Sequence, residues 1–158
     1  MIPAFKYTGL GAVLFCLLLS ACEESACDTS TRTAIQLKFY SRTTDSIPKD
    51  TVITLDLEGI YGIGREDSIL FEGASVSLVT LPLPLEGDSC QFVMEFPTQS
   101  DTLTLTFDRQ LRYISKGCGF VTWFTIRDAT ITENAVRNIS IVEPSVTTSN
   151  EENIKLYF

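Results

Sequence analysis

The chain has 158 residues and a formal net charge of −8, with 44% hydrophobic and 20% charged residues. This length suits one domain with its own core and excludes a multidomain protein, and the ten Phe, five Tyr and one Trp exclude a disordered chain. The acidic charge argues against nucleic acid as a partner, and the absence of histidine removes the commonest general base and metal ligand.

The chain begins with a segment typical of an export signal. A single cation, Lys6, precedes an apolar run over residues 10–19, LGAVLFCLLL, which is shorter than the roughly 20 residues of a membrane-spanning helix. The run ends in residues 19–22, Leu-Ser-Ala-Cys, which resemble the lipobox of bacterial lipoproteins. This resemblance implies that the Cys22 sulfur receives a diacylglyceryl group, that a signal peptidase cleaves before Cys22, and that the new amino group is acylated, for example with palmitate. The alternatives are an ordinary secretory signal with a cysteine near its cleavage point, and an uncleaved membrane anchor.

We therefore expect residues 1–21 to be a lipoprotein signal peptide, residues 22–33 a lipidated tether, and residues 34–158 the folded domain. Two or three acyl chains hold a protein on a membrane almost permanently, because each buried methylene contributes about 0.8 kcal/mol. The acidic pair Glu23 and Glu24 resembles the surface-export signal of lipoproteins in the Bacteroidota, and it equally fits a solvated tether. The expected location is the outer membrane, on its periplasmic face or on the cell surface.

After residue 33 the sequence alternates between apolar and polar residues with the period of two that is typical of half-buried β-strands. No segment has the apolar stripe and caps of an amphipathic helix. The clearest alternation lies at Ile35, Leu37 and Phe39; Ile53, Leu55 and Leu57; Phe92, Met94 and Phe96; and Leu103, Leu105 and Phe107. Further expected strands are residues 76–80, 111–115, 120–126, 138–142 and 154–158.

Turn-forming residues separate these strands at residues 46–50, 86–88, 97–101 and 143–145. About seven to nine short strands at this spacing favour an all-β domain, an immunoglobulin-like antiparallel β-sandwich. A small β-barrel is the alternative. The glycines of residues 59–64, GIYGIG, lack the spacing of a phosphate-binding loop and predict a bulge or a turn.

Three cysteines remain for the domain if Cys16 leaves with the signal peptide and Cys22 is lipidated. They permit one internal disulfide in an oxidising compartment. We expect a bridge from Cys27 to Cys118, which would tie the tether to a strand; a bridge from Cys90 to Cys118 and the absence of any bridge are the alternatives. Cys90 shares its strand face with two apolar residues, so we expect a buried thiol there.

Residues 118–126 are apolar on both faces, as in a central strand that is covered on both sides. Trp123 lies in this strand, where core or edge packing is its commonest role, but an exposed indole would also suit the apolar face of a pyranose ring. Trp123 is therefore the candidate residue for stacking on a glycan.

Four Asp-Ser or Asp-Thr pairs, each followed by an apolar residue, resemble the three-residue O-glycosylation signal of exported proteins in the Bacteroidota. Such pairs also occur where a turn leads into a strand, because the side chains hydrogen-bond to the backbone. The candidate acceptors are Ser46, Thr51, Ser68 and Thr102.

The sequence predicts no catalytic residue, no cofactor and no metal ligand, and therefore no enzyme. Glycoside hydrolysis needs two carboxylates at a set separation. Scattered carboxylates are expected in a chain this acidic, and three cysteines without a C-x-x-C pair do not predict a zinc site.

Six short segments form a set: the lipobox, Cys27, Leu81-Pro82-Leu83, Asp101-Thr102-Leu103, Ser115-Lys116-Gly117-Cys118-Gly119-Phe120 and Asn153-Ile154-Lys155-Leu156-Tyr157-Phe158. Together they resemble a family of Bacteroidota outer-membrane lipoproteins of unknown function. The resemblance implies an outer-membrane location and a β-rich domain, and it implies no activity.

We therefore expect a lipid-anchored lipoprotein of the cell envelope that serves as a non-catalytic structural or interaction module. The alternative is a glycan-binding surface lipoprotein that uses Trp123. The expected partners are the membrane, through the lipid on Cys22, and an envelope protein or a glycan.

Overall fold

The structure is a computed structural model that describes Cys27, residues 30–44 and residues 46–158. The predicted signal peptide, residues 1–21, and the predicted lipid attachment site, Cys22, lie outside these residues. Within the described ranges, no helix has the length and hydropathy needed to cross a membrane.

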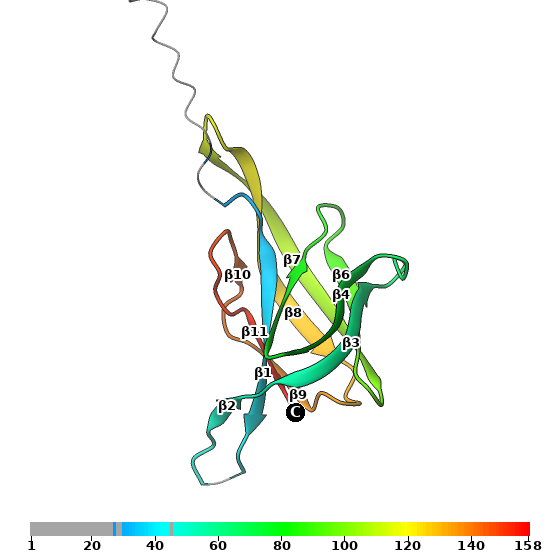
Figure 1. Cartoon of the computed structure of the whole chain (residues 1–158). Coiled ribbons are helices and arrows are strands. Elements are labelled where there is room, and N and C mark those ends of the chain that lie inside the picture. The colour runs from blue at the N-terminus through cyan, green and yellow to red at the C-terminus, as the bar shows by residue number, and fades with distance from the viewer. Residues whose placement is uncertain (1–26, 28–29, 45) are drawn as a thin grey trace, which may run out of the picture.

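The strands form two sheets that pack face to face (Figure 1). The first sheet consists of β1 (Ala34–Arg42), β2 (Asp50–Val52), β5 (Leu78–Pro82), β9 (Asn138–Ile141) and β11 (Ile154–Tyr157). The second sheet has the order β10-β8-β7-β6-β3-β4. Its strands are β3 (Leu55–Gly62), β4 (Ile69–Val76), β6 (Ser89–Glu95), β7 (Ser100–Ser115), β8 (Gly119–Ile131) and β10 (Ser145–Val146). The predicted all-β sandwich is therefore confirmed.

The first and last strands of the domain lie side by side. β1 pairs with β11 in parallel, with Leu37 opposite Ile154 and Tyr40 opposite Tyr157. The other edge of β1 pairs antiparallel with two strands in succession: residues 34–38 pair with β5, and residues 40–42 pair with β2. β1 is thus the strand that places β11, at the end of the domain, in the same sheet as β2 and β5.

The core lies between the two sheets and contains the apolar residues that alternate along their strands. The predicted alternation of Leu103, Leu105 and Phe107 is confirmed, since all three side chains are fully buried. Each such side chain contributes roughly 1.5–3 kcal/mol on burial. The largest fully buried side chains are Phe39, Phe107, Phe124, Ile35, Leu37, Leu57, Ile60, Leu81, Met94, Leu103, Leu105 and Ile154.

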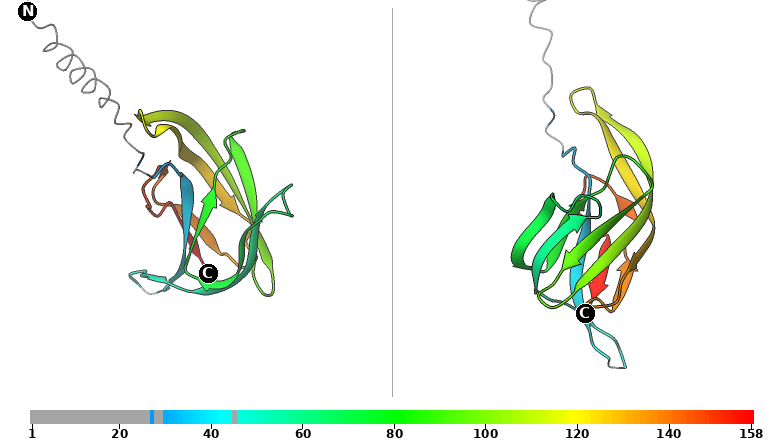
Figure 2. Two further views of the ribbon diagram at one scale, coloured as in Figure 1. Left: turned by 45° about the horizontal axis from the view of Figure 1, so that its top comes forward. Right: turned by 90° about the vertical axis from the view of Figure 1, so that its right-hand side faces the viewer.

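The hairpin formed by β7 and β8 is longer than the sheet that it packs against. β7 has 16 residues and β8 has 13, whereas β1 has 9 and β11 has 4. The outer part of the hairpin therefore projects beyond the rest of the sandwich, as the right-hand view of Figure 2 shows. The turn at its tip places Gly119 at a φ of 70°, a left-handed conformation that glycine adopts without steric cost.

Several strand boundaries differ from the sequence-based prediction. The strand expected over residues 76–80 is present but displaced: β4 ends at Val76, and β5 begins in the other sheet at Leu78 and runs to Pro82. The segments 103–107 and 111–115 belong to one strand, β7, with a register shift between Thr106 and Phe107. The bulge expected in residues 59–64 is confirmed by a register shift between Ile60 and Tyr61.

Asp101 is a buried carboxylate that holds the loop after β8. Its exposed fraction is 1%, and it accepts hydrogen bonds from the Thr132 hydroxyl and from the backbone N–H groups of Asn134, Ala135 and Val136, all at 2.8–2.9 Å. Burial raises the pKa of Asp101, but these hydrogen bonds outweigh it and keep the pKa below its ordinary value. The ionised carboxylate is therefore part of the folded structure.

Replacing Asp101 with Asn should destabilise the domain and change its response to acid. The amide NH₂ would face two backbone donors, which we expect to cost about 3 kcal/mol. A lowered native pKa contributes stability above the unfolded pKa of about 4, and this stability is lost as the pH falls through the native value. Urea unfolding at neutral and acidic pH should therefore show a smaller acid destabilisation for Asp101→Asn than for the wild type. Asp67→Asn, at an exposed carboxylate, is the control, and equal effects of the two substitutions would contradict this role.

Candidate functional site

A disulfide attaches the start of the described chain to the tip of the hairpin. Cys27 and Cys118 are bonded; their Cα atoms are 4.8 Å apart, and the two residues are 91 positions apart in sequence. This is the first of the three cysteine arrangements that the sequence left open. The backbone N–H of Cys118 also donates to the hydroxyl of Ser115 at 3.1 Å, which orders the turn that carries the disulfide.

A second contact fixes the same N-terminal segment to the hairpin. The hydroxyl of Thr33 donates to the carbonyl of Thr122 in β8 at 2.8 Å. The disulfide and this hydrogen bond lie near the two ends of the segment 27–33 that precedes β1. The end of the predicted tether is thus attached to the hairpin before the chain enters the sandwich.

Cys90 is a free thiol that packs partly buried against the core. Burial raises the pKa of this thiol to about 11. The thiol is therefore protonated at physiological pH and resembles a small apolar residue, as predicted, but it is partly buried where a buried thiol was expected.

The outer part of the hairpin exposes three large apolar side chains on one face. Leu111, Tyr113 and Phe120 have exposed fractions of 64%, 59% and 63%. We call this set the overhang face. Tyr113 lies opposite Phe120 in the β7–β8 register, and the two ring centroids are 5.3 Å apart.

The overhang face continues the core-facing side of the hairpin. Alternate residues of a strand share a face, so Leu111 and Tyr113 follow Phe107 along the same side of β7. Phe107 is fully buried because the first sheet covers it, and the side chains farther along lie beyond that cover. The expectation that residues 118–126 are covered on both faces holds for Val121 on one face and for Phe124 and Ile126 on the other, which are buried, and it is wrong for Phe120.

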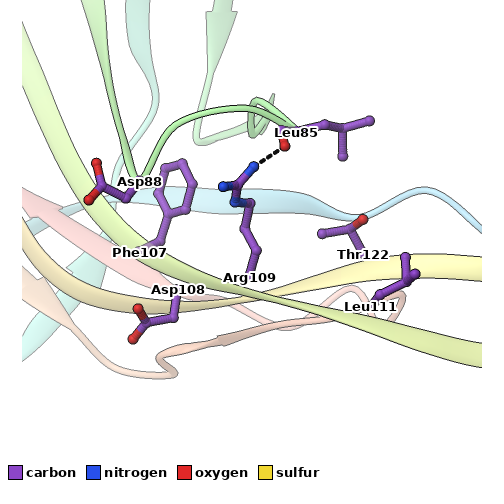
Figure 3. A pocket seen from close by; sticks show the side chains of 7 residues that line it. All are labelled: Leu85, Asp88, Phe107, Asp108, Arg109, Leu111 and Thr122. Carbon is purple, nitrogen blue, oxygen red and sulfur yellow. Dashed lines mark hydrogen bonds between the residues drawn. The ribbon is translucent and has the colours of Figure 1, made fainter.

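A shallow cavity of about 380 Å³ lies at the base of the overhang face. The guanidinium of Arg109 points across it and donates to the carbonyl of Leu85 (Figure 3). This hydrogen bond connects β7 to the loop between β5 and β6. The lining residues are Leu85, Asp88, Phe107, Asp108, Arg109, Leu111 and Thr122.

Trp123, the candidate residue for glycan stacking, lies on β8 with its indole half-buried. The guanidinium of Arg112 lies 5.3 Å from the ring centre, so a cation occupies one face of the indole. The indole N–H is buried and has no hydrogen-bond partner among the described residues. A pyranose could therefore stack only on the remaining ring face, and glycan binding at Trp123 stays a prediction.

A polar network that the sequence did not predict lies on the outer side of the first sheet. Asp50 accepts from Arg42 at 2.7 Å, from Lys155 at 3.0 Å and from the Tyr157 hydroxyl at 3.0 Å. We call these four residues the Asp50 network. Hydrogen bonds from Arg42 and Lys155 hold the pKa of Asp50 well below its ordinary value. The four side chains come from β1, β2 and β11, so the network ties the three strands together.

Tyr40 lies beside this network. Its hydroxyl donates to Glu152 at 2.8 Å, and the Lys155 ammonium lies 4.6 Å from its ring centre. Burial, followed by the hydrogen bond to Glu152 and the charge of Glu152, raises the pKa of Tyr40 to about 12. Its hydroxyl is therefore protonated at physiological pH, and we interpret the contacts around Tyr40 as structural.

The four candidate O-glycosylation residues lie in different environments. Thr102 is half-buried within β7, and its neighbour Asp101 is buried. Thr51 is exposed in β2, but Asp50 belongs to the Asp50 network. Ser46 and Ser68 are exposed in loops, so these two offer the most accessible hydroxyls.

The described part of the chain contains no cluster of three Cys, Asp or Glu side chains that could hold a metal ion.

The Cys27–Cys118 disulfide should contribute strongly to stability. Closing a loop of this length contributes about 4 kcal/mol through the entropy of the unfolded chain. We expect Cys27→Ser and Cys118→Ser to lower the free energy of urea unfolding by similar amounts, and the double variant to lose no more than either single variant. A reductant should bring the wild type to the level of the variants, which is the matched control. Additive losses in the double variant would contradict the bridge.

Glu152→Gln should lower the pKa of Tyr40. The substitution removes a negative charge that opposes ionisation of the phenol, whereas the burial of the ring remains. We expect the pKa of Tyr40 to fall below about 12 but to stay above that of an exposed tyrosine, about 10. Titration of ¹³Cζ-labelled tyrosine by NMR measures it, with Glu151→Gln, at an exposed neighbour, as the control. An unchanged Tyr40 pKa would contradict the contact.

Comparison with known proteins identifies a family for this chain, and that family has no assigned activity. No curated protein and no solved structure matches the chain. Four of the six segments noted in the sequence fall inside the range that the family match covers, whereas the lipobox and Cys27 precede it. With residues 54–158 matched, the chain belongs to a family of unknown function, DUF6452.

Proposed function

We propose that this protein is a lipid-anchored lipoprotein of the bacterial outer membrane, held by acyl chains on Cys22, with a non-catalytic structural or interaction role in the cell envelope. The lipobox at residues 19–22 is the sequence basis for the anchor. In this proposal the mature chain begins at Cys22, and the β-sandwich follows it after a short tether.

The observation that carries the proposal is the Cys27–Cys118 disulfide. Structural disulfides persist in oxidising compartments such as the bacterial periplasm and the cell surface, and they are rare in the cytosol. This disulfide involves a residue five positions after Cys22. It therefore supports export of the chain and gives the lipidated end a firm attachment to the folded domain.

Among the bacterial membranes we favour the outer membrane, on its periplasmic face or on the cell surface. An aspartate directly after the lipidated cysteine would resemble an inner-membrane retention signal, but the residue after Cys22 is Glu23. Glu23 and Glu24 form an acidic pair. This pair resembles the surface-export signals of Bacteroidota lipoproteins. The periplasmic face of the same membrane is the other location compatible with the anchor.

Cys22→Ala should abolish acylation of the chain in a host that processes lipoproteins. We expect the wild type to incorporate an alkyne-labelled palmitate and to enter the detergent phase on Triton X-114 partition. The variant should lose the label completely, because the acceptor sulfur is gone. The palmitate label is the decisive readout. Detergent partition alone is not, because an uncleaved signal peptide also holds a precursor on the membrane.

Cys16→Ala is the matched control because Cys16 lies in the same N-terminal region, within the apolar run. It should keep the palmitate label and the detergent partition of the wild type. Equal labelling of the wild type and Cys22→Ala would overturn the proposal. So would loss of the label in both cysteine variants.

A further inference from the structure

The outer part of the β7–β8 hairpin is basic, although the chain as a whole is acidic. Residues 109–120 contain three cations and no carboxylate, in a chain whose net charge is −8. All three cations are exposed, and they are Arg109, Arg112 and Lys116. The part of this acidic domain that projects from the sandwich is therefore locally basic.

The same part of the hairpin carries the overhang face. Three large side chains, two of them aromatic, are each about three-fifths exposed within a few residues of the tip. Aromatic side chains flanked by Lys and Arg are typical of segments that lie at a lipid–water interface, because the rings enter the boundary and the cations reach the head groups.

The predicted anchor lies close to this tip. Cys27 lies five positions after Cys22, so a fully extended chain spans at most about 18 Å between them. Cys27 is bonded to Cys118, which lies two positions from Phe120. The lipid on Cys22 therefore confines the hairpin tip to the vicinity of the bilayer surface, and it leaves the far end of the sandwich unconstrained.

We propose that the overhang face enters the interface of the membrane to which Cys22 is anchored, so that Leu111, Tyr113 and Phe120 form a second, non-covalent lipid contact. This inference rests on the proposed function. Because Glu23 and Glu24 make the tether acidic, the contact is carried mainly by the apolar side chains, and the cations contribute next to anionic head groups. The disulfide and the hairpin would then orient the domain with its tip toward the bilayer.

The contact is tested with the full chain, acylated in cells, purified and reconstituted into vesicles of phosphatidylcholine with a minority of phosphatidylglycerol. The chain has one tryptophan, so Trp123→Phe provides a background without indole fluorescence. Phe120→Trp in this background places an indole on the overhang face. Tyr113→Trp gives the same readout from the facing strand if Phe120→Trp does not fold.

The control indole is Ile47→Trp in the same background. Ile47 is 84% exposed and belongs to the loop between β1 and β2, which lies at the opposite end of the sandwich from the hairpin tip (Figure 1). We expect brominated phosphatidylcholine to reduce the emission of the hairpin indole by roughly half or more, and to leave the control indole unchanged.

The outcomes separate this inference from the proposed function. Quenching at the hairpin only supports the contact. A chain that is acylated and floats with the vesicles but shows no quenching at the hairpin overturns the contact and leaves the anchor intact. If neither the brominated lipid nor a water-soluble quencher reduces the emission of the hairpin indole, a protein partner or a second copy covers it. This result also overturns the lipid contact and leaves the anchor intact. Equal quenching at both ends also overturns the contact. A chain without acyl groups that does not float overturns both proposals.

Discussion

The β7–β8 hairpin is longer than the sheet that covers it, and this difference in length determines where the molecule exposes apolar surface. Along β7 the same face holds Phe107, which is fully buried, and then Leu111 and Tyr113, which are exposed. Alternation of side chains keeps these residues on one side of the strand regardless of whether a second sheet is present. The apolar face at the hairpin tip is thus a continuation of the core beyond its cover.

The Cys27–Cys118 disulfide gives that exposed face a defined position in the molecule. It joins Cys27 to the tip, and the hydrogen bond from Thr33 to Thr122 fixes the residue before β1 to β8. If Cys22 is lipidated, the hairpin is the part of the domain nearest the bilayer. The Asp50 network stabilises a different part of the fold, where β1, β2 and β11 meet, and its ionised groups are already paired with one another. The two features therefore have separate roles.

The fold class was predictable because the core residues alternate along their strands, as Leu103, Leu105 and Phe107 do. β4 gave no such signal: it is an edge strand with most of its residues exposed on both faces, so its sequence has no apolar period. The Asp50 network was not predictable because Arg42 and Lys155 meet only through the parallel pairing of the first and last strands. The shared strand face of Phe107, Leu111 and Tyr113 follows from their spacing in the sequence. The exposure of the overhang face was not predictable, because it depends on where the opposing sheet ends.

The account depends on a lipid at Cys22, and mass spectrometry of the N-terminal peptide of the purified full-length product tests it most directly. The account predicts a mature chain that begins at Cys22, with the mass of a diacylglyceryl group on its sulfur and of a further acyl chain on its amino group. A peptide that retains residues from the first 21, that begins at another position, or that carries an unmodified thiol at Cys22 would contradict it.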